Sequence, residues 1–320
     1  MKILIASIVS QDAIETLRVD HEVVYTPGAG EDELCSAIEG CDALVFRSGV
    51  EITARVLDHA PDLSVIVRAG SGYDNIDLGV LERRVLHFFR VPGPGAKAVA
   101  EMAFTLMLAL SRRLSWADRE WRGGNWVKRQ AAGVLMTGKV LGIIGAGNIG
   151  SRTGELGAAW GMDVLGCVEY PNPEVEASLA RKGITLVGKD ELLERSDFVS
   201  IHVPLQDSTI DLITARELAL MKPGSYLVNM ARGGVVNEPD LLHALESGHL
   251  AGAGLDVHVS EGDGNISPLA HLDNVLLTPH IGAATTDTQR EIGTVIVRCI
   301  QHAEQNPPTE KAIEANFIVM

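Results

Sequence analysis

The stretch Lys139-Val-Leu-Gly-Ile-Ile-Gly-Ala-Gly-Asn-Ile-Gly150 decides the fold of this chain. Its first half is an apolar run of strand length, and its second half has the spacing G-x-G-x-x-G. Residues 149–160 can continue as a helix despite two internal glycines. A strand, a glycine turn and a helix in this order are typical of dinucleotide binding, because the turn approaches a pyrophosphate closely and the helix start offers free N–H groups. A plain strand–turn–helix without a ligand is the alternative interpretation.

This glycine turn lies near the middle of the 320 residues, so enough chain precedes it for a separate domain. Short apolar runs alternate with helical patterns on both sides of it. The alternation predicts an α/β protein with two doubly wound parallel sheets, each covered by helices on both faces. Strands are expected at 3–7, 22–25, 43–47, 65–68, 85–88, 140–144, 163–168, 198–202, 226–229, 253–256 and 275–277. Helices are expected at 11–19, 31–38, 98–113 and 286–304.

Two of these helices are expected to connect the domains. The segment Val91-Pro-Gly-Pro-Gly95 predicts a break in regular structure, after which the helix at 98–113 carries the chain into the second domain. The helix at 286–304 is expected to return to the first. Two such crossings predict a cleft between the domains, the usual place for a cofactor to meet a substrate.

Composition and charge exclude several classes of partner. A net charge of −15 without a dense basic cluster argues against nucleic acid. The opening residues read as a strand rather than a signal peptide, and the longest apolar helical stretch is too short for a bilayer, so no membrane partner is expected. The cysteines lack zinc-ligand spacing, which predicts no metal site and reduced thiols of a cytoplasmic protein. They are Cys35, Cys41, Cys167 and Cys299.

Three reactive side chains follow expected strands, namely Arg232, Glu261 and His280. Ligands of doubly wound sheets bind outside the carboxyl ends of the strands. Histidine exchanges protons near neutral pH, a carboxylate bonded to it orients the ring and favours its protonated form, and arginine offers a bidentate fork for a carboxylate. Reduction of a 2-oxo acid needs these groups beside a hydride donor. Taken singly, each residue also fits a surface or capping role.

The ordered set of motifs resembles the D-2-hydroxyacid dehydrogenase family over nearly the whole chain, closest to its 3-phosphoglycerate dehydrogenase and glyoxylate-hydroxypyruvate reductase branch. The motifs are Gly145–Gly150, His202–Pro204, Met221–Gly224, Asn229–Gly234, Gly254–Val257 and Pro279–Gly282. The resemblance implies that Arg232, Glu261 and His280 are catalytic. It further implies a Rossmann-type cofactor domain, residues 97–285, inserted into a flavodoxin-like substrate domain, residues 1–96 and 286–320. A homodimer formed through the cofactor domain is also implied.

The resemblance implies NAD as the cofactor. The family usually places an aspartate at the adenosine ribose, but Val168 stands there, and Glu169 follows one residue later. Glu169 lies about twenty residues past the glycine turn, where a ribose acid is expected, and no cation follows before Arg181, so NAD is favoured over NADP. An ordinary strand-end charge is the alternative for Glu169. The expected cofactor residues are Gly145, Gly147, Asn148, Ile149, Gly150, Glu169, Val203, Pro204, Met230, Ala231, Asp256, Gly282 and Ala283.

The first domain is expected to bind the substrate. The backbone N–H groups of Gly70, Ser71 and Gly72 would form a nest for a carboxylate, with a plain glycine turn as the alternative. Positive charge on the same sheet edge predicts a substrate with two anionic ends, as the resemblance to the 3-phosphoglycerate branch implies. The residues that complete this expected substrate site are Arg47, Ser48 and Arg68.

Three departures from the family pattern bear on these expectations. Glu261 is followed by Gly262 where the family usually has proline, which predicts a looser loop. Lys97 replaces the family's small polar residues and is either an extra substrate contact or a solvated helix start. No regulatory extension is expected beyond Met320. Two other functions stay open, an NAD-sensing corepressor-like binding module and a formate or phosphite dehydrogenase.

Overall fold

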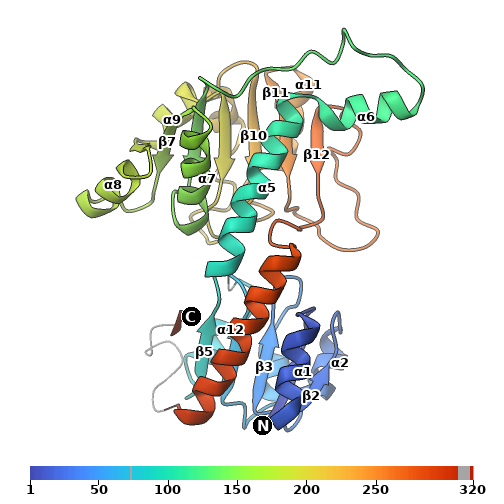
Figure 1. Ribbon diagram of the computed structural model, residues 1–320, viewed down its shortest axis with the longest axis vertical. Helices are drawn as coiled ribbons and strands as arrows, with labels where there is room; N and C mark the ends of the chain where they lie inside the picture. Colours follow the sequence, from blue (N-terminus) through green and yellow to red (C-terminus); the bar gives the residue numbers. More distant parts are fainter. Residues whose placement is uncertain (73, 309–317, 320) are drawn as a thin grey trace. The chain divides into compact units, whose positions relative to one another are not determined.

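The chain forms two compact α/β units in the computed structural model (Figure 1). The structure describes residues 1–72, 74–308 and 318–319. The first unit comprises Met1–Ala96 and Ala284–Met320, and the second comprises Lys97–Ala283. Tyr73, next to the expected substrate residues 70–72, lies outside the described residues, as do residues 309–317 and 320 of the expected first domain.

The described part of the first unit contains a six-stranded parallel sheet with the order β13-β5-β4-β3-β1-β2. Without β13 this is the flavodoxin-like order. Its strands are β1 (Lys2–Ile5), β2 (Glu22–Tyr25), β3 (Ala43–Phe46), β4 (Val65–Arg68), β5 (His87–Arg90) and β13 (Ile318–Val319). Its helices are α1 (Gln11–Asp20), α2 (Glu31–Ala37), α3 (Ala54–Asp58), α4 (Leu78–Leu81) and α12 (Thr286–Gln305).

Both faces of this first sheet are covered by apolar layers. Helices α1 and α12 lie side by side on one face (Figure 1), where Leu17 and Ile296 are buried against strand residues such as Ile5 and Val67. Helices α2, α3 and α4 cover the other face around Phe46. Because α12 packs against α1 and β4, residues from both ends of the chain build one core.

The second unit, whose residues are all described, contains a seven-stranded parallel sheet with the order β12-β11-β10-β9-β6-β7-β8. This is the Rossmann order with one strand added. Its strands are β6 (Val140–Ile144), β7 (Asp163–Cys167), β8 (Ile184–Leu186), β9 (Phe198–Ile201), β10 (Ser225–Asn229), β11 (Leu250–Leu255) and β12 (Val275–Leu277). Its helices are α5 (Gly93–Ser111), α6 (Leu114–Arg122), α7 (Asn148–Ala159), α8 (Pro173–Ala180), α9 (Lys189–Arg195), α10 (Ala215–Leu220) and α11 (Glu238–Glu246).

Helices α5 and α7 pack on one face of this second sheet, and α9, α10 and α11 pack on the other. The glycines inside α7 make its close approach possible. A Cβ at Gly154 would lie 2.5 Å from Ile184, and one at Gly157 would lie 2.6 Å from Leu141. The glycines that weaken the helical pattern in the sequence therefore allow α7 to pack closely against the sheet.

The predicted doubly wound fold class is confirmed, but two expected elements need correction and two strands were missed. Helix α5 begins at Gly93 rather than at 98, because Pro94 occupies the first turn, where a missing N–H breaks no helical bond. Strand β5 covers 87–90 rather than 85–88. Strands β8 and β13 were not predicted, since each is only two or three residues long. None of the helices in the described ranges combines the length and apolarity that crossing a bilayer requires.

Candidate active site

The glycine turn between β6 and α7 has the geometry of an anion cradle. Gly145 has φ +86°, and a Cβ there would lie 2.9 Å from the His202 carbonyl carbon. A Cβ at Gly150 would lie 2.2 Å from the Gly145 carbonyl oxygen. The first helical hydrogen bond ends on the Gly147 carbonyl, so the N–H groups of residues 148–150 stay available at the helix start. The residues present therefore fit a bound pyrophosphate.

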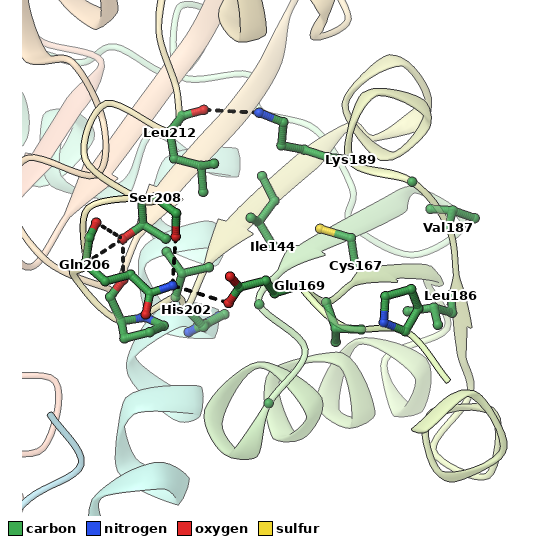
Figure 2. A pocket seen from close by; sticks show the side chains of 18 of the residues that line it. Ile144, Cys167, Glu169, Leu186, Val187, Lys189, His202, Gln206, Ser208 and Leu212 are labelled. Carbon is green, nitrogen blue, oxygen red and sulfur yellow. Dashed lines mark hydrogen bonds between the residues drawn. The ribbon is translucent and has the colours of Figure 1, made fainter. Parts of the chain in front are cut away.

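A pocket of about 740 Å³ lies beside this turn (Figure 2). Glu169 and Gln206 point toward one another in it, and Gln206 Nε2 donates a hydrogen bond to Glu169 Oε2 at 3.3 Å. Lys189 also lines the pocket but donates to the Leu212 carbonyl and to Glu217. The further lining includes Gly145, Gly147, Val168, Val203 and Pro204. Gln206 was missed by the sequence reasoning, because nothing in its local pattern links it to Glu169.

The loop after β10 holds Arg232 in place. Asn229, fully buried at the strand end, accepts a hydrogen bond from the Ala231 N–H and donates one to the Arg232 carbonyl, both at 3.0 Å. Met230 and Ala231 are buried beside it. The Arg232 side chain is partly exposed, and its Nη1 donates to the Ala231 carbonyl at 2.8 Å. The strand end therefore sets where this guanidinium stands.

His280 and Glu261 form an ion pair. His280 Nδ1 lies 2.9 Å from Glu261 Oε2, and the two side chains are 26% and 37% exposed. Burial raises the pKa of Glu261, but the hydrogen bond and charge of His280 outweigh it, so the pKa is lowered on balance. Glu261 is thus a carboxylate at neutral pH. His280 has φ +53°, a conformation uncommon outside glycine and typical of functional turns.

Asp256 anchors the turn that carries His280. The Asp256 side chain is 2% exposed. It accepts hydrogen bonds from Thr278 Oγ1 at 2.6 Å, the Ile281 N–H at 2.9 Å and the Gly282 N–H at 2.7 Å. A Cβ at Gly282 would lie 2.8 Å from Asp256 Oδ2, so glycine permits this approach. The sequence indicated only a cofactor contact for Asp256, and this anchoring role was missed together with Thr278.

The strand order brings the reactive residues to one edge of the second sheet. Arg232, Glu261 and His280 follow β10, β11 and β12, which are neighbours. The glycine turn follows β6, and β9 lies between β6 and β10, with Val203 and Pro204 just past its end. Ala283 is the last residue of the unit. Parallel strands place all their carboxyl ends at the same edge, where ligands bind.

One of the three N–H groups expected to form a carboxylate nest in the first unit needs correction. The Gly70 N–H is not free, because it donates to the Arg68 carbonyl at 2.9 Å in a tight turn. Ser71 and Gly72 follow it and are partly exposed. Arg68 is only 2% exposed, and its Nε donates to Asn75 Oδ1 at 3.1 Å. A Cβ at Gly70 would overlap its guanidinium, so glycine here makes room for Arg68.

Arg47 lines a second pocket, of about 590 Å³, within the first unit. Its Nη1 donates to Gln289 Oε1 and to the Ile8 carbonyl, and its buried Nε has no partner among the described residues. Burial lowers the pKa of Arg47. Arg290 also lines this pocket, and Ser48 is exposed in the turn that follows Arg47.

Comparisons with known proteins agree with these features. Residues 104–282 match the NAD binding domain of the D-isomer specific 2-hydroxyacid dehydrogenases. The chain is 36% identical to D-3-phosphoglycerate dehydrogenase of Methanocaldococcus jannaschii over 314 residues, 98% of this chain and 59% of that protein. It therefore spans about three fifths of that relative. It is 39% identical to hydroxypyruvate reductase of Thermotoga maritima over 272 residues, 84% of this chain and 87% of that protein.

A solved structure extends the similarity to the whole fold. D-lactate dehydrogenase of Aquifex aeolicus, complexed with NAD and lactic acid, superposes with a TM-score of 0.83 at 27% identity. The match covers 100% of this chain and 99% of that one. The family resemblance seen in the motifs is confirmed.

Proposed function

Because the chain belongs to the D-isomer specific 2-hydroxyacid dehydrogenase family, we propose that it is an NAD-dependent oxidoreductase interconverting a D-2-hydroxy acid and its 2-oxo acid. The observation that carries this function is the 2.9 Å pair of Glu261 and His280, which follow strands adjacent to the one that precedes Arg232. The Aquifex aeolicus relative bound to NAD and lactic acid supports both the cofactor and the substrate class.

In the proposed mechanism, a cofactor held at the glycine turn of residues 145–150 would donate a hydride to the substrate's C2 carbon as NADH, or accept one from it as NAD. Arg232 binds the substrate carboxylate with its guanidinium. His280 Nδ1 is engaged by Glu261, which leaves Nε2 to donate the proton to the forming alkoxide, or to accept it in the oxidation direction. The Glu261 charge stabilises the protonated ring.

The proposed preference for NAD over NADP follows from charge in the pocket of Figure 2. Glu169, held by Gln206, presents a carboxylate that would accept hydrogen bonds from ribose hydroxyls and repel a 2′-phosphate. Lys189 is already paired with Glu217. We expect the wild-type enzyme to have a much lower kcat/KM with NADPH than with NADH. Glu169→Gln should reduce the ratio of these two kcat/KM values. Equal values for the wild-type enzyme would refute the preference.

We further propose a substrate with two anionic ends, because Arg47 lines a pocket of the first unit together with Arg290. Arg47→Ala should lower kcat/KM for 3-phosphohydroxypyruvate far more than for pyruvate. Arg18→Ala, an exposed change on α1, serves as the control. Equal effects of Arg47→Ala on both substrates would contradict the idea.

The exposed apolar side chains of α6 and the segment after it support a homodimer through the second unit. Leu114, Trp121, Trp126 and Leu135 are 60–73% exposed. Sedimentation analysis should give a dimer, and Trp126→Lys should weaken it.

We also propose a cytoplasmic location, since Cys35, Cys41, Cys167 and Cys299 are buried free thiols, as in reducing compartments.

The decisive experiment measures NADH oxidation with glyoxylate, hydroxypyruvate, 3-phosphohydroxypyruvate, pyruvate and bulkier 2-oxo acids. We expect turnover on at least one, reduced at least a hundredfold in His280→Ala and Arg232→Ala. Thermal melts must show both variants folded. Near-normal turnover in both would refute the mechanism. Activity with formate or phosphite alone would select that class, and NADH binding without turnover would favour a sensing module.

A further inference from the structure

We propose that His258 is a positioning residue that ties the loop carrying Glu261 to the turn carrying His280. The proposal concerns the same acid–base pair and therefore rests on the proposed function. His258 follows β11 by three residues, is half-buried, and has no role in the mechanism above.

The His258 ring and the His280 backbone share one acceptor. His258 Nε2 lies 3.0 Å from the Thr278 carbonyl oxygen, and the His280 N–H donates to the same oxygen at 3.0 Å. A carbonyl only accepts, so Nε2 carries the hydrogen and Nδ1 of the neutral ring has none. Nδ1 is buried without a partner in the described parts of the chain. The ring is therefore held by the contact with Thr278.

The backbone N–H of His258 completes a closed chain of hydrogen bonds. This N–H donates to Glu261 Oε1 at 3.3 Å, and the same carboxylate holds His280 Nδ1. The contacts form a closed chain from Glu261 through His258 and Thr278 to His280, and back to Glu261. A shift of the His258 ring therefore changes both ends of the acid–base pair.

A third loop packs against the same peptide. A Cβ at Gly233 would lie 1.9 Å from the His258 carbonyl oxygen, so only glycine allows the loop of Arg232 to pass there. The next N–H, of Val259, donates to Glu238 Oε1 on α11 at 3.1 Å. His258 thus stands where the loops of all three proposed catalytic residues meet. The ionisable groups on the segments packed against it are Arg232, Glu238, Asp256, Glu261 and His280.

The loop that carries Glu261 is not held by core packing, so its position depends on the hydrogen bonds of His258, which we call the tie. Residues 259–266 are all exposed, and Gly262 has φ +111°. His258 is the last residue before this exposed run whose side chain is partly buried.

The test compares His258→Leu, which removes the donor, with His258→Gln, whose amide nitrogen can reach the Thr278 carbonyl. His249→Leu is the matched control, because His249 Nε2 makes the same type of bond, 3.0 Å to the Leu218 carbonyl, at the opposite edge of the sheet. We expect kcat to fall about tenfold in His258→Leu, with the basic limb of its pH profile at lower pH and an unchanged Kd for NADH. His258→Gln should restore most of the kcat and most of the position of the basic limb. His249→Leu should change neither the kcat nor the pH profile.

Two kinetic outcomes overturn the proposal: a His258→Leu enzyme with wild-type kcat and pH profile, or a His258→Gln enzyme as impaired as His258→Leu. A nuclear magnetic resonance titration of the His280 ring distinguishes failure of the positioning role of His258 from failure of the proposed function. The His280 signal is assigned by its loss in His280→Gln. The titration needs no turnover. If wild type reduces no oxo acid, the function fails, whereas the tie still predicts a lower titration midpoint for His280 in His258→Leu. An unchanged midpoint refutes the tie.

Discussion

Replacing Glu261 with glutamine tests the acid–base pair most directly. The lowered pKa of Glu261, in which the charge and hydrogen bond of His280 outweigh burial, makes it a carboxylate at neutral pH. It therefore stabilises protonated His280, the form that donates a proton during reduction. Glutamine keeps the shape but loses the charge. Protonated His280 should then persist only to lower pH, so reduction slows at neutral pH while oxidation extends to lower pH.

The magnitude follows from geometry and exposure. A hydrogen bond between charged groups contributes about 1.5–3 kcal/mol when buried, and an exposed ion pair contributes about 0–1 kcal/mol. At 2.9 Å, with side chains 26% and 37% exposed, the Glu261–His280 pair lies between these limits. A value of about 1.4 kcal/mol corresponds to about a tenfold lower kcat for reduction at neutral pH.

The assay is the pH dependence of kcat for oxo-acid reduction and for hydroxy-acid oxidation. Both limbs should move to lower pH in Glu261→Gln. Glu246→Gln is the matched control, because Glu246 pairs with His271 at 3.5 Å at the end of α11, away from the carboxyl ends of the strands. Limbs that stay in place or move to higher pH would refute the reasoning.

Three further changes have defined outcomes. Asp256→Asn should lower the free energy of unfolding by about 1–3 kcal/mol in urea titrations and reduce kcat, since an amide cannot accept from all three donors. Unchanged values would contradict the anchoring role. Gly150→Ala should abolish NADH binding in fluorescence titrations while Gly30→Ala binds normally, because only the first Cβ meets backbone, 2.2 Å from the Gly145 carbonyl oxygen. Burial raises the pKa of Glu217, but its hydrogen bonds lower it from 4.5 to about 2, so it stabilises the fold by about 3 kcal/mol at neutral pH and loses this as pH falls from 4.5 to 2. Urea unfolding of Glu217→Gln should differ from wild type at pH 7 and hardly at pH 2, and an equal difference at both would contradict this.

The glycine turn and the strands around it were predictable because their signals are local. An apolar run of five residues before G-x-G-x-x-G determines β6 almost completely, and its bounds match the prediction at 140–144. β8 has only three residues, and its pairing with β7 depends on a partner distant in sequence. Short edge strands carry too few side chains for a periodic signal.

The reactive residues were identifiable from their place after strands, but their partners were not. Glu261 and His280 are nineteen positions apart, and the sheet order makes their strands neighbours. The anchoring by Asp256, the contact of Gln206 with Glu169 and the shared carbonyl of Thr278 all join segments that no local pattern connects.

By itself, the sequence determined the α/β class, the dinucleotide turn and which residue types stand after which strands, because strand and helix periods and glycine turns act over a few residues. Only the tertiary structure decided which side chains meet. In the folded chain the Gly70 N–H donates within a turn, and the Arg68 side chain is buried. His258 lies where three loops meet. Parallel strands bring distant loops to one edge of a sheet, and close packing then selects the contacts.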